Sequence, residues 1–369
     1  MTNEYRSDQN RVPGHRAILR RLSDRRTLLR GAAGLGLTAG ALGALNRQAA
    51  SQELQPATPA PATPGGEYVG SDSTTTGNTG AATPAPIGEL PPFTPYDPVL
   101  KPAASYPKEI LTTFRDQTVF VAKDVAYAAW TFDGTVPGPV HRAVVGDTIN
   151  VTVRNEAALA HNLDFHSAQV NPERAYHVVQ PGEEFQWSFQ PKYPGAYMYH
   201  CGTAPVLMHI GAGMYSTMIV DPAEGWSPAQ ELVFIQSEFY LTPADGDVMV
   251  TDAEKLFSGG TPNYVVFNGY ANQYVEYPIT VKVGEPIRIF VINCGPNVWS
   301  SFHVVGAIFD RVYLNANPAN ESIGMQSVSI GPGDGACVEF TLDEPGTYVA
   351  VNHSFGHAAN GAQALLRAE

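Results

Sequence analysis

Two short segments of the chain carry the side-chain types that bind transition metals. One is His161-Asn-Leu-Asp-Phe-His166, and the other starts at His200-Cys201 and continues to His209 and Met214. A soft thiolate, two imidazoles and a weak axial thioether are the ligand set of a blue-copper electron-transfer site. A buried cysteine near unrelated histidines is the structural alternative. The order and spacing of the four ligand types favour a first copper site, formed by His161, Cys201, His209 and Met214.

The alternation of side chains along a strand explains how these segments could serve two metal ions. His161 and His166 are five positions apart and His200 and Cys201 are adjacent, so each pair is expected to point to opposite faces. One face then offers His161 and Cys201, and the other offers His166 and His200, with Asp164 beside them. We therefore predict a second copper site, and the Cys201–His200 link would be a short covalent route for an electron between the two ions. Such a pair of sites indicates a redox enzyme rather than a simple electron carrier.

The elements that must position these residues are predicted to be strands. The 369 residues include 35 glycines and 30 prolines, which favour turn-rich β structure over a helix bundle. Short alternating runs such as Thr148–Arg154 and Pro286–Ile292 are bounded by turn residues. Val145-Gly-Asp-Thr-Ile is repeated as Val283-Gly-Glu-Pro-Ile, so the chain holds two copies of one domain. We predict an all-β protein with two tandem β-sandwich domains, residues 101–223 and 224–369.

The N-terminal 100 residues are predicted to lie outside these domains. A twin arginine, Arg25-Arg26, precedes the apolar stretch Gly31–Leu45, which predicts a Tat-type signal peptide in residues 1–50. This stretch is shorter than the ~20 residues that a membrane-spanning helix needs, although a retained anchor is an alternative. Residues 51–100 are rich in Pro, Thr and Ala and read as a disordered linker. We expect export to the periplasm or the cell exterior, and the alternative is an exported protein that stays tethered to the cell surface.

Charge and cysteine content narrow the classes of partner. The chain has 22 basic and 35 acidic residues, and residues 1–50 hold nine arginines and three acids, which leaves a net charge of −19 on the remainder. This acidity argues against nucleic-acid binding and fits either plain solubility or attraction of a basic electron donor.

Cys294 and Cys337 lie in two strand-like segments of the second half. In an oxidising compartment they could form a disulfide or remain two buried thiols, and the sequence leaves both open.

The motifs resemble those of the copper-containing nitrite reductase family, whose members are two-domain cupredoxins with Greek-key β-sandwiches. The resemblance rests on Thr131–Pro139, His161–His166, Tyr199–Met214, Ser301–Gly306 and Val351–Ser354, and it covers about residues 110 to 369. It implies reduction of nitrite to nitric oxide, a step of denitrification, with one type 1 and one type 2 copper per chain. It also implies a homotrimer and a small electron-donor protein, either a cupredoxin or a c-type cytochrome.

The resemblance also assigns roles to individual residues. It maps the type 1 ligands onto His161, Cys201, His209 and Met214, and the type 2 ligands onto His166, His200 and His353. In the family the third type 2 ligand comes from a neighbouring subunit. Asp164 and His303 match the acid–base pair that supplies two protons to nitrite, and Val305 lies where the family usually has a bulkier aliphatic residue above the catalytic copper.

Two departures from the family concern the expected substrate side. The segment Ser167–Val179 replaces a stretch that is often glycine-rich, and Val305 replaces the usual isoleucine. Two alternatives stay open: a two-domain multicopper oxidase-like enzyme that acts on another small substrate, or a copper electron carrier without catalysis. A laccase-type oxidase is strongly disfavoured. A laccase builds its trinuclear cluster from four His-x-His pairs, and this chain has none.

Overall fold

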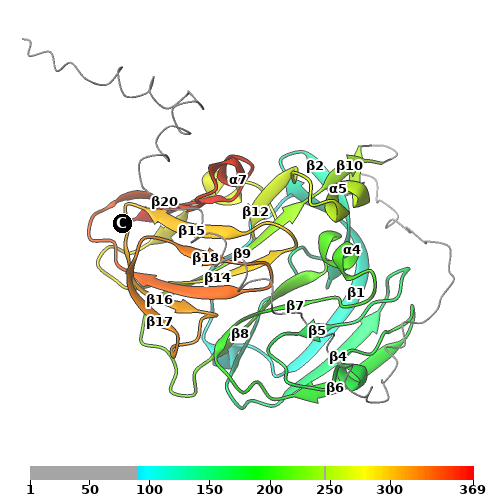
Figure 1. Cartoon of the computed structure of the whole chain (residues 1–369). Coiled ribbons are helices and arrows are strands. Elements are labelled where there is room, and N and C mark those ends of the chain that lie inside the picture. Colours follow the sequence, from blue (N-terminus) through cyan, green and yellow to red (C-terminus); the bar gives the residue numbers. More distant parts are fainter. Residues whose placement is uncertain (1–89, 91, 245–246) are drawn as a thin grey trace, which may run out of the picture. The chain divides into compact units, whose positions relative to one another are not determined.

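The computed structural model of the chain describes residues 90, 92–244 and 247–369, in which strands are the main element (Figure 1). The predicted signal peptide and most of the predicted linker lie outside the described residues. The described residues belong to one compact unit. Within them, the predicted all-β class with two β-sandwich halves is confirmed, while the domain boundary at residue 223 stays a prediction.

Eight strands come from the first half of the folded chain. They are β1 (Glu109–Ala122), β2 (Val125–Phe132), β3 (His141–Val144), β4 (Ile149–Asn155), β5 (Asp164–Phe165), β6 (Glu184–Phe189), β7 (Gly195–His200) and β8 (Tyr215–Asp221). Two short strands of the second half, β10 (Leu241–Pro243) and β11 (Val248–Thr251), join them. The strand orders are β10-β11-β2-β1-β4-β6 in one sheet and β3-β8-β7-β5 in the other. The second sheet carries the two metal-binding segments of the sequence.

The second half forms another pair of sheets. Its other strands are β9 (Gln230–Phe239), β12 (Tyr264–Phe267), β13 (Ile279–Val281), β14 (Ile287–Gly295), β15 (Ser300–Val305), β16 (Phe309–Leu314), β17 (Glu321–Met325), β18 (Val328–Ile330), β19 (Gly335–Phe340), β20 (Gly346–Asn352) and β21 (Gln363–Ala368). They are ordered β12-β9-β14-β19-β16-β17 and β13-β21-β20-β15-β18.

Helices in the described residues are short and lie in the connections. They are η3 (Ala103–Ser105), α3 (Pro172–Ala175), α4 (Val206–Gly211), α5 (Ala253–Phe257), α6 (Gln273–Glu276) and α7 (Phe355–Ala359). Among residues 90, 92–244 and 247–369, no helix has the length and apolar character to cross a bilayer.

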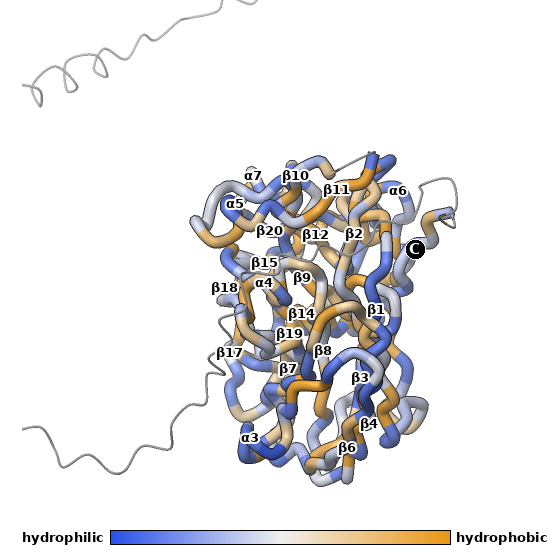
Figure 2. The backbone as a smooth tube through the Cα atoms, turned by 90° about the vertical axis from the view of Figure 1, so that its right-hand side faces the viewer, coloured by the Kyte–Doolittle hydropathy of each residue, from blue (hydrophilic) through white to orange (hydrophobic). Residues whose placement is uncertain are grey.

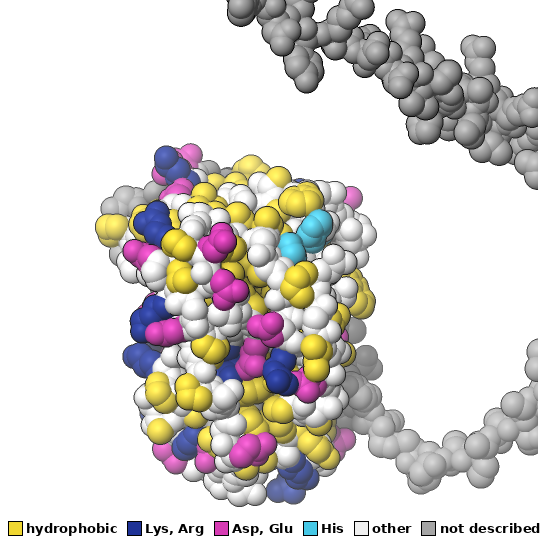
Figure 3. All heavy atoms as spheres, turned by 90° about the vertical axis from the view of Figure 1, so that its left-hand side faces the viewer, with side chains coloured by type: hydrophobic (Ala, Val, Ile, Leu, Met, Phe, Trp, Pro, Cys, Tyr) yellow, Lys and Arg dark blue, Asp and Glu magenta, His cyan; other side chains and the backbone are white. Residues whose placement is uncertain are grey.

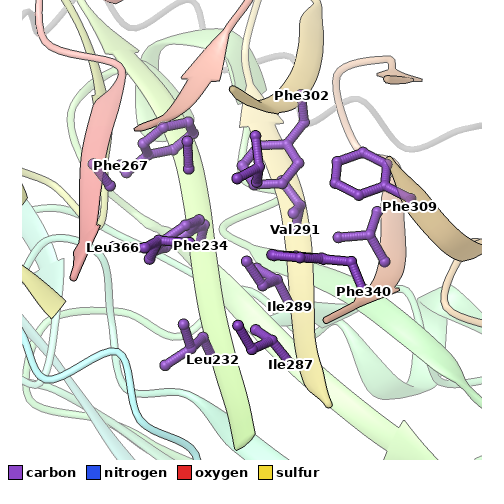
Figure 4. Close-up of a cluster of buried hydrophobic side chains, with 14 of the residues drawn as sticks. Leu232, Phe234, Phe267, Ile287, Ile289, Val291, Phe302, Phe309, Phe340 and Leu366 are labelled. Atoms are coloured by element: carbon purple, nitrogen blue, oxygen red, sulfur yellow. The ribbon is translucent and has the colours of Figure 1, made fainter. Parts of the chain in front are cut away.

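Side-chain alternation builds a core in each half. In β4, Ile149, Val151 and Val153 are buried while the residues between them are more exposed. Figure 2 shows the resulting change between hydrophobic and hydrophilic positions along the strands. The core of the second half lies between its two sheets (Figure 4), where Phe234, Phe302 and neighbouring aliphatic residues pack together. Because these side chains point inward, the residues between them, including His303, are directed outward.

A third buried cluster and a set of ion pairs join the two halves. Met198 of β7 and Ile219 of β8 pack with Val233, Phe290 and Cys337 of the second half. Arg142 Nη1 lies 2.7 Å from Glu231, and Arg288 Nη1 lies 2.9 Å from the same carboxylate. Both arginines are almost fully buried, at 3% and 1% exposed. Removal of one partner from such a buried network leaves an uncompensated charge, so the two halves are firmly connected here.

Residues at the end of the predicted linker also contact the second half. The Phe93 ring stacks on Tyr270 at 3.8 Å, Leu100 is buried, and the Leu100 amide donates a hydrogen bond to the Glu231 carbonyl. The folded unit therefore extends to before residue 101.

Candidate metal centres

A first group of metal-binding side chains lies in the first half. His161 precedes β5, Cys201 follows β7, and His209 belongs to α4. The Nδ1 atoms of His161 and His209 are 3.0 Å apart, and Cys201 Sγ lies 3.8 Å from the first and 3.2 Å from the second. Ligand atoms bound at about 2.0–2.3 Å to one ion lie about 3–4 Å from one another. The three donor atoms therefore fit a single transition-metal ion.

The loop after Cys201 returns Met214 to this group. The Cys201 amide donates to the Met214 carbonyl, and the Met214 amide donates to the His209 carbonyl. Gly213 has a φ of +120° and lies against Val136 and the Trp130 carbonyl, a conformation and a space that suit only glycine. Met214 is fully buried and belongs to the same core cluster as Cys201. A buried thioether thus lies in the same cluster as the thiol of the two-imidazole, one-thiol donor group.

Burial controls the protonation of the first group. It lowers the pKa of His209 to about 4, and burial together with the neighbouring His209 lowers the pKa of His161 to about 3. Neutral imidazoles are the form that binds a metal. Burial raises the pKa of the Cys201 thiol, whereas the Asn162 amide, 3.4 Å from the sulfur, acts in the opposite direction. Trp130 packs on the His209 ring at 4.8 Å and shields the group from water.

A second group lies beside the first. It contains Asp164, His166 and His200, in which Asp164 of β5 pairs with His200 of β7. The Nε2 atoms of the two histidines are 3.0 Å apart, and Asp164 Oδ2 lies 4.0 Å from His200 Nε2. His200 Nδ1 lies 3.0 Å from the Cys201 carbonyl oxygen. The tautomer that donates this hydrogen bond leaves the Nε2 lone pair free for a metal.

The surroundings of His166 come from both halves of the chain. A Cβ atom on Gly333, in the turn between β18 and β19, would lie 3.7 Å from the His166 ring. The pKa of His166 is lowered, first by burial and then by the neighbouring His200. Two imidazole nitrogens and one carboxylate oxygen lie close together in this group, which fits an ion with an open coordination position.

His303 and His353 form a separate pair on the surface of the second half. In β15, Phe302 and Val304 are buried in the core, so His303 and Val305 share the outward face, and Val305 is 46% exposed. His353 follows β20, and its ring lies 5.5 Å from that of His303. Histidines are visible beside hydrophobic side chains on the surface in Figure 3. Among the described residues, the groups of three or more close donors include neither His303 nor His353. A single chain therefore does not bring His353 to His166 and His200.

Other candidate residues of the sequence have structural surroundings. Cys294 and Cys337 are buried free thiols and form no disulfide. His141 is buried between Phe165 and Tyr199, and its Nε2 has no hydrogen-bond partner. His177 is exposed and packs on Phe185.

Sequence reasoning missed Tyr176. It lies in the unusual segment after His166, and its hydroxyl donates a hydrogen bond of 3.2 Å to the carbonyl of Phe165, next to Asp164. In the sequence, the departure of this segment from the family pattern was the feature that could have drawn attention to Tyr176.

Comparisons with known proteins identify the family to which this chain is similar. A sequence-family model described as multicopper oxidase matches residues 113–225. The copper-containing nitrite reductase of Neisseria meningitidis serogroup B is 38% identical over 307 residues, which are 77% of this chain and 76% of that protein.

Solved structures of copper nitrite reductases share the fold. The copper nitrite reductase of Nitrosomonas europaea matches with a TM-score of 0.67 and 35% identity, over 71% of this chain and 93% of the other. The copper-containing nitrite reductase of Thermus scotoductus matches with a TM-score of 0.66 and 33% identity, over 71% of this chain and 61% of the other. The order of the donors, their geometry and the extent of these similarities show that this chain belongs to the copper-containing nitrite reductase family.

Proposed function

We propose that this protein reduces nitrite to nitric oxide with bound copper. The reaction consumes one electron and two protons and releases nitric oxide and water. The observation that carries the proposal is the separation of two donor groups by one peptide unit, with His200 in one group and Cys201 in the other. A family whose members are named copper-containing nitrite reductases supports the choice of metal and substrate.

In this proposal the two donor groups hold different copper ions. His161, Cys201, His209 and Met214 would hold type 1 copper, for which a thiolate and two neutral imidazoles are suitable ligands. His166 and His200 would hold type 2 copper together with His353 of a second copy. When bound, type 1 copper supplies reversible one-electron transfer and type 2 copper supplies an open position that binds and polarises nitrite. The His200–Cys201 peptide and its 3.0 Å hydrogen bond connect the two groups.

The chain's own residues would handle the protons. Asp164 is 25% exposed and its carboxylate faces the same point as the His166 and His200 nitrogens. From there it would hydrogen-bond to nitrite and deliver a proton to its oxygen. His303 lies beside His353 and would therefore come from the second copy, where it would provide the second proton through Nε2, because its Nδ1 is engaged by the Gln326 carbonyl. Val305, on the same outward face of β15, would line the substrate pocket.

The proposal requires an oligomer, and we propose a homotrimer. His353 is exposed, and its ring lies 4.8 Å from that of Phe355, an apolar side chain that is 61% exposed. An apolar surface around an unpaired donor suits burial against a second copy. Mixing a His353→Ala variant with a His166→Ala variant should restore part of the activity, because some interfaces then contain both wild-type residues. No recovery after verified subunit exchange would contradict the shared site.

Export and electron supply are further parts of the proposal. Residues 1–50 would direct export by the twin-arginine route, and a small cupredoxin or c-type cytochrome would deliver electrons. Replacement of Arg25 and Arg26 by lysine should retain the protein in the cytoplasm, which fractionation measures. Normal export of this variant would contradict a twin-arginine signal.

The central experiment is nitric oxide release by the purified, copper-loaded protein with nitrite and an artificial reductant. We expect release that depends on copper and on both donor groups. The Cys294→Ala variant is a matched control, because Cys294 is a buried cysteine outside the donor groups. A protein that carries copper and accepts electrons but releases no nitric oxide would be an electron carrier and would contradict the proposal.

A further inference from the structure

The side chain of the residue before His353 fixes the backbone around it. Asn352 is the last residue of β20, and its side-chain oxygen accepts a hydrogen bond of 3.1 Å from the amide of Ser354, two positions further on. The same oxygen accepts a hydrogen bond of 3.2 Å from the amide of Ser301 in β15. The amide of His353 itself donates to the Ser301 carbonyl at 2.7 Å. The backbone on both sides of His353 is therefore tied to one buried side chain and to the neighbouring strand.

The nitrogen of the Asn352 side chain points the other way, into the core. It donates to the side-chain oxygen of Gln236 in β9 at 3.0 Å and to the Trp299 carbonyl at 3.1 Å, and His357 Nδ1 lies 3.5 Å away. The two oxygens can only accept, and the backbone amides on the opposite side can only donate. These contacts together specify the orientation of the Asn352 amide group.

Gln236 is held from its other end as well. Its nitrogen donates to the side-chain oxygen of Asn293 in β14 at 3.3 Å. The Asn293 side-chain nitrogen donates to the carbonyls of Val298 and Ile330 at 2.7 and 3.0 Å. Asn293, Gln236 and Asn352 are each 0% exposed, and every nitrogen and oxygen of their three side-chain amides has a partner. A buried polar network in which all groups are satisfied is rigid.

The His353 ring lies at the surface, outside this rigid network. Its side chain is exposed, and the aromatic rings beside it are those of His303 at 5.5 Å and Phe355 at 4.8 Å. The direction of a side chain is coupled to the backbone that carries it. For His353, that backbone is the segment that Asn352 fixes.

We propose that Asn352 and Gln236 are positioning residues for His353. Asn352 fixes the backbone of this segment, Gln236 fixes the side chain of Asn352, and together they direct the imidazole outward, toward the type 2 site of a second copy. The inference rests on the proposed function, in which His353 completes that site. The competing account is a polar network that stabilises the fold of the second half and has no effect on copper binding.

The test compares Gln236→Met with Gln273→Met, because each replaces a buried glutamine of the second half by an unbranched side chain of similar size. Gln273 of α6 is 1% exposed and has a separate set of partners, the carbonyls of Phe267 and Asn268 and the amide of Tyr96. Competition with a chelator of known affinity measures copper binding at the type 2 site, and spin resonance identifies that site.

We expect Gln236→Met to weaken type 2 copper binding by roughly ten- to hundredfold, the usual loss when a group that orients a ligand is removed. The type 2 spin-resonance signal should change, while the type 1 absorption stays as in the wild type. Gln273→Met should bind type 2 copper within about twofold of the wild type even if its unfolding temperature falls as far, because a hydrogen bond lost elsewhere leaves His353 in place. Wild-type type 2 affinity in Gln236→Met, or equal losses of affinity in the two variants, would overturn the inference.

A double-variant cycle tests whether Gln236 acts through Asn352. In an Asn352→Ala background, Gln236→Met should change type 2 copper affinity by less than about twofold, since the residue through which it acts is already gone. Additive losses of affinity would overturn the inference.

A third measurement uses the wild-type, copper-free protein and does not depend on folding of the variants. Hydrogen exchange should show protection of the Ser354 amide although Ser354 is exposed, because this amide is bonded to the Asn352 side chain. Rapid exchange of the Ser354 amide would overturn the inference. A wild type that binds no type 2 copper or does not reduce nitrite would instead refute the proposed function.

Discussion

Substitution of Gly213 by alanine tests how the loop after Cys201 positions Met214. Gly213 has a φ of +120°, which side chains rarely adopt. An added Cβ would lie 2.8 Å from Val136 Cγ2 and 2.9 Å from the Trp130 carbonyl oxygen. The Trp130 amide is itself bonded to the Ala212 carbonyl, so the backbone on that side is restrained. The methyl group therefore has no free direction to move, and the loop that carries Met214 must shift.

The structure separates two contributions to the loss of stability. Backbone strain at positive φ costs about 1–2 kcal/mol, and insertion of a methyl group into a packed site costs about 1–3 kcal/mol. The total for Gly213→Ala is therefore about 2–5 kcal/mol. Gly225 provides a matched control, because it has a φ of +74° but no heavy atom within 4 Å of an added Cβ. Gly225→Ala should cost only the strain of about 1–2 kcal/mol.

The assay is denaturant unfolding of both variants beside the wild type, followed by visible absorption after copper loading. We expect Gly213→Ala to lose more stability than Gly225→Ala and to show a weakened or shifted thiolate-to-copper band, because Met214 moves. Equal stability losses in the two variants, with an unchanged band in Gly213→Ala, would refute the account of this loop.

Three further predictions concern Asp164, His141 and the metal. Asp164→Asn should lower nitrite turnover by at least tenfold with both coppers retained; turnover that is unchanged across pH would remove its role in proton delivery. Burial lowers the pKa of His141 to about 4. The folded state therefore resists protonation of His141. The neutral imidazole contributes to stability above pH ~6.5, and this contribution of about 2–3 kcal/mol is lost as the pH falls toward 4. His141→Phe should thus show a smaller loss of unfolding free energy between pH 7.5 and 4.5 than the wild type; an identical loss would mean that His141 is protonated in the folded state. Removal of copper by a chelator should abolish nitric oxide release and lower the unfolding temperature, since a metal that binds the folded state stabilises it; an unchanged unfolding temperature would argue against metal bound at these donors.

The strand pattern of the sequence was sufficient for the fold class and for part of the site. Alternation places the adjacent residues His200 and Cys201 in different donor groups, because β7 continues in an extended form to its last residue. Alternation along a strand does not by itself explain why His161 and His166 lie in different donor groups. The strand between them, β5, has only two residues, and His161 forms an isolated bridge with Val179. Their separation therefore depends on the returning segment as well as on the strand.

Features that depend on tertiary contacts were not predictable from local patterns. The helix α4, which carries His209, has six residues and too little length for a helical period to appear in the sequence. The Tyr176 hydroxyl reaches the Phe165 carbonyl only because α3 turns the chain back toward β5. The contact of Phe93 with Tyr270 joins residues that are far apart in the sequence, and the composition of residues 51–100 predicted only a linker.

Copper stoichiometry by elemental analysis and spin resonance tests the central claim most directly. The claim is that neighbouring residues serve two separate copper sites, so the wild type should bind two coppers per chain with distinct signals. Cys201→Ala should lose the type 1 signal and keep type 2, and His166→Ala should do the reverse. One copper per chain in the wild type, or loss of both signals from either substitution in a folded protein, would contradict the account.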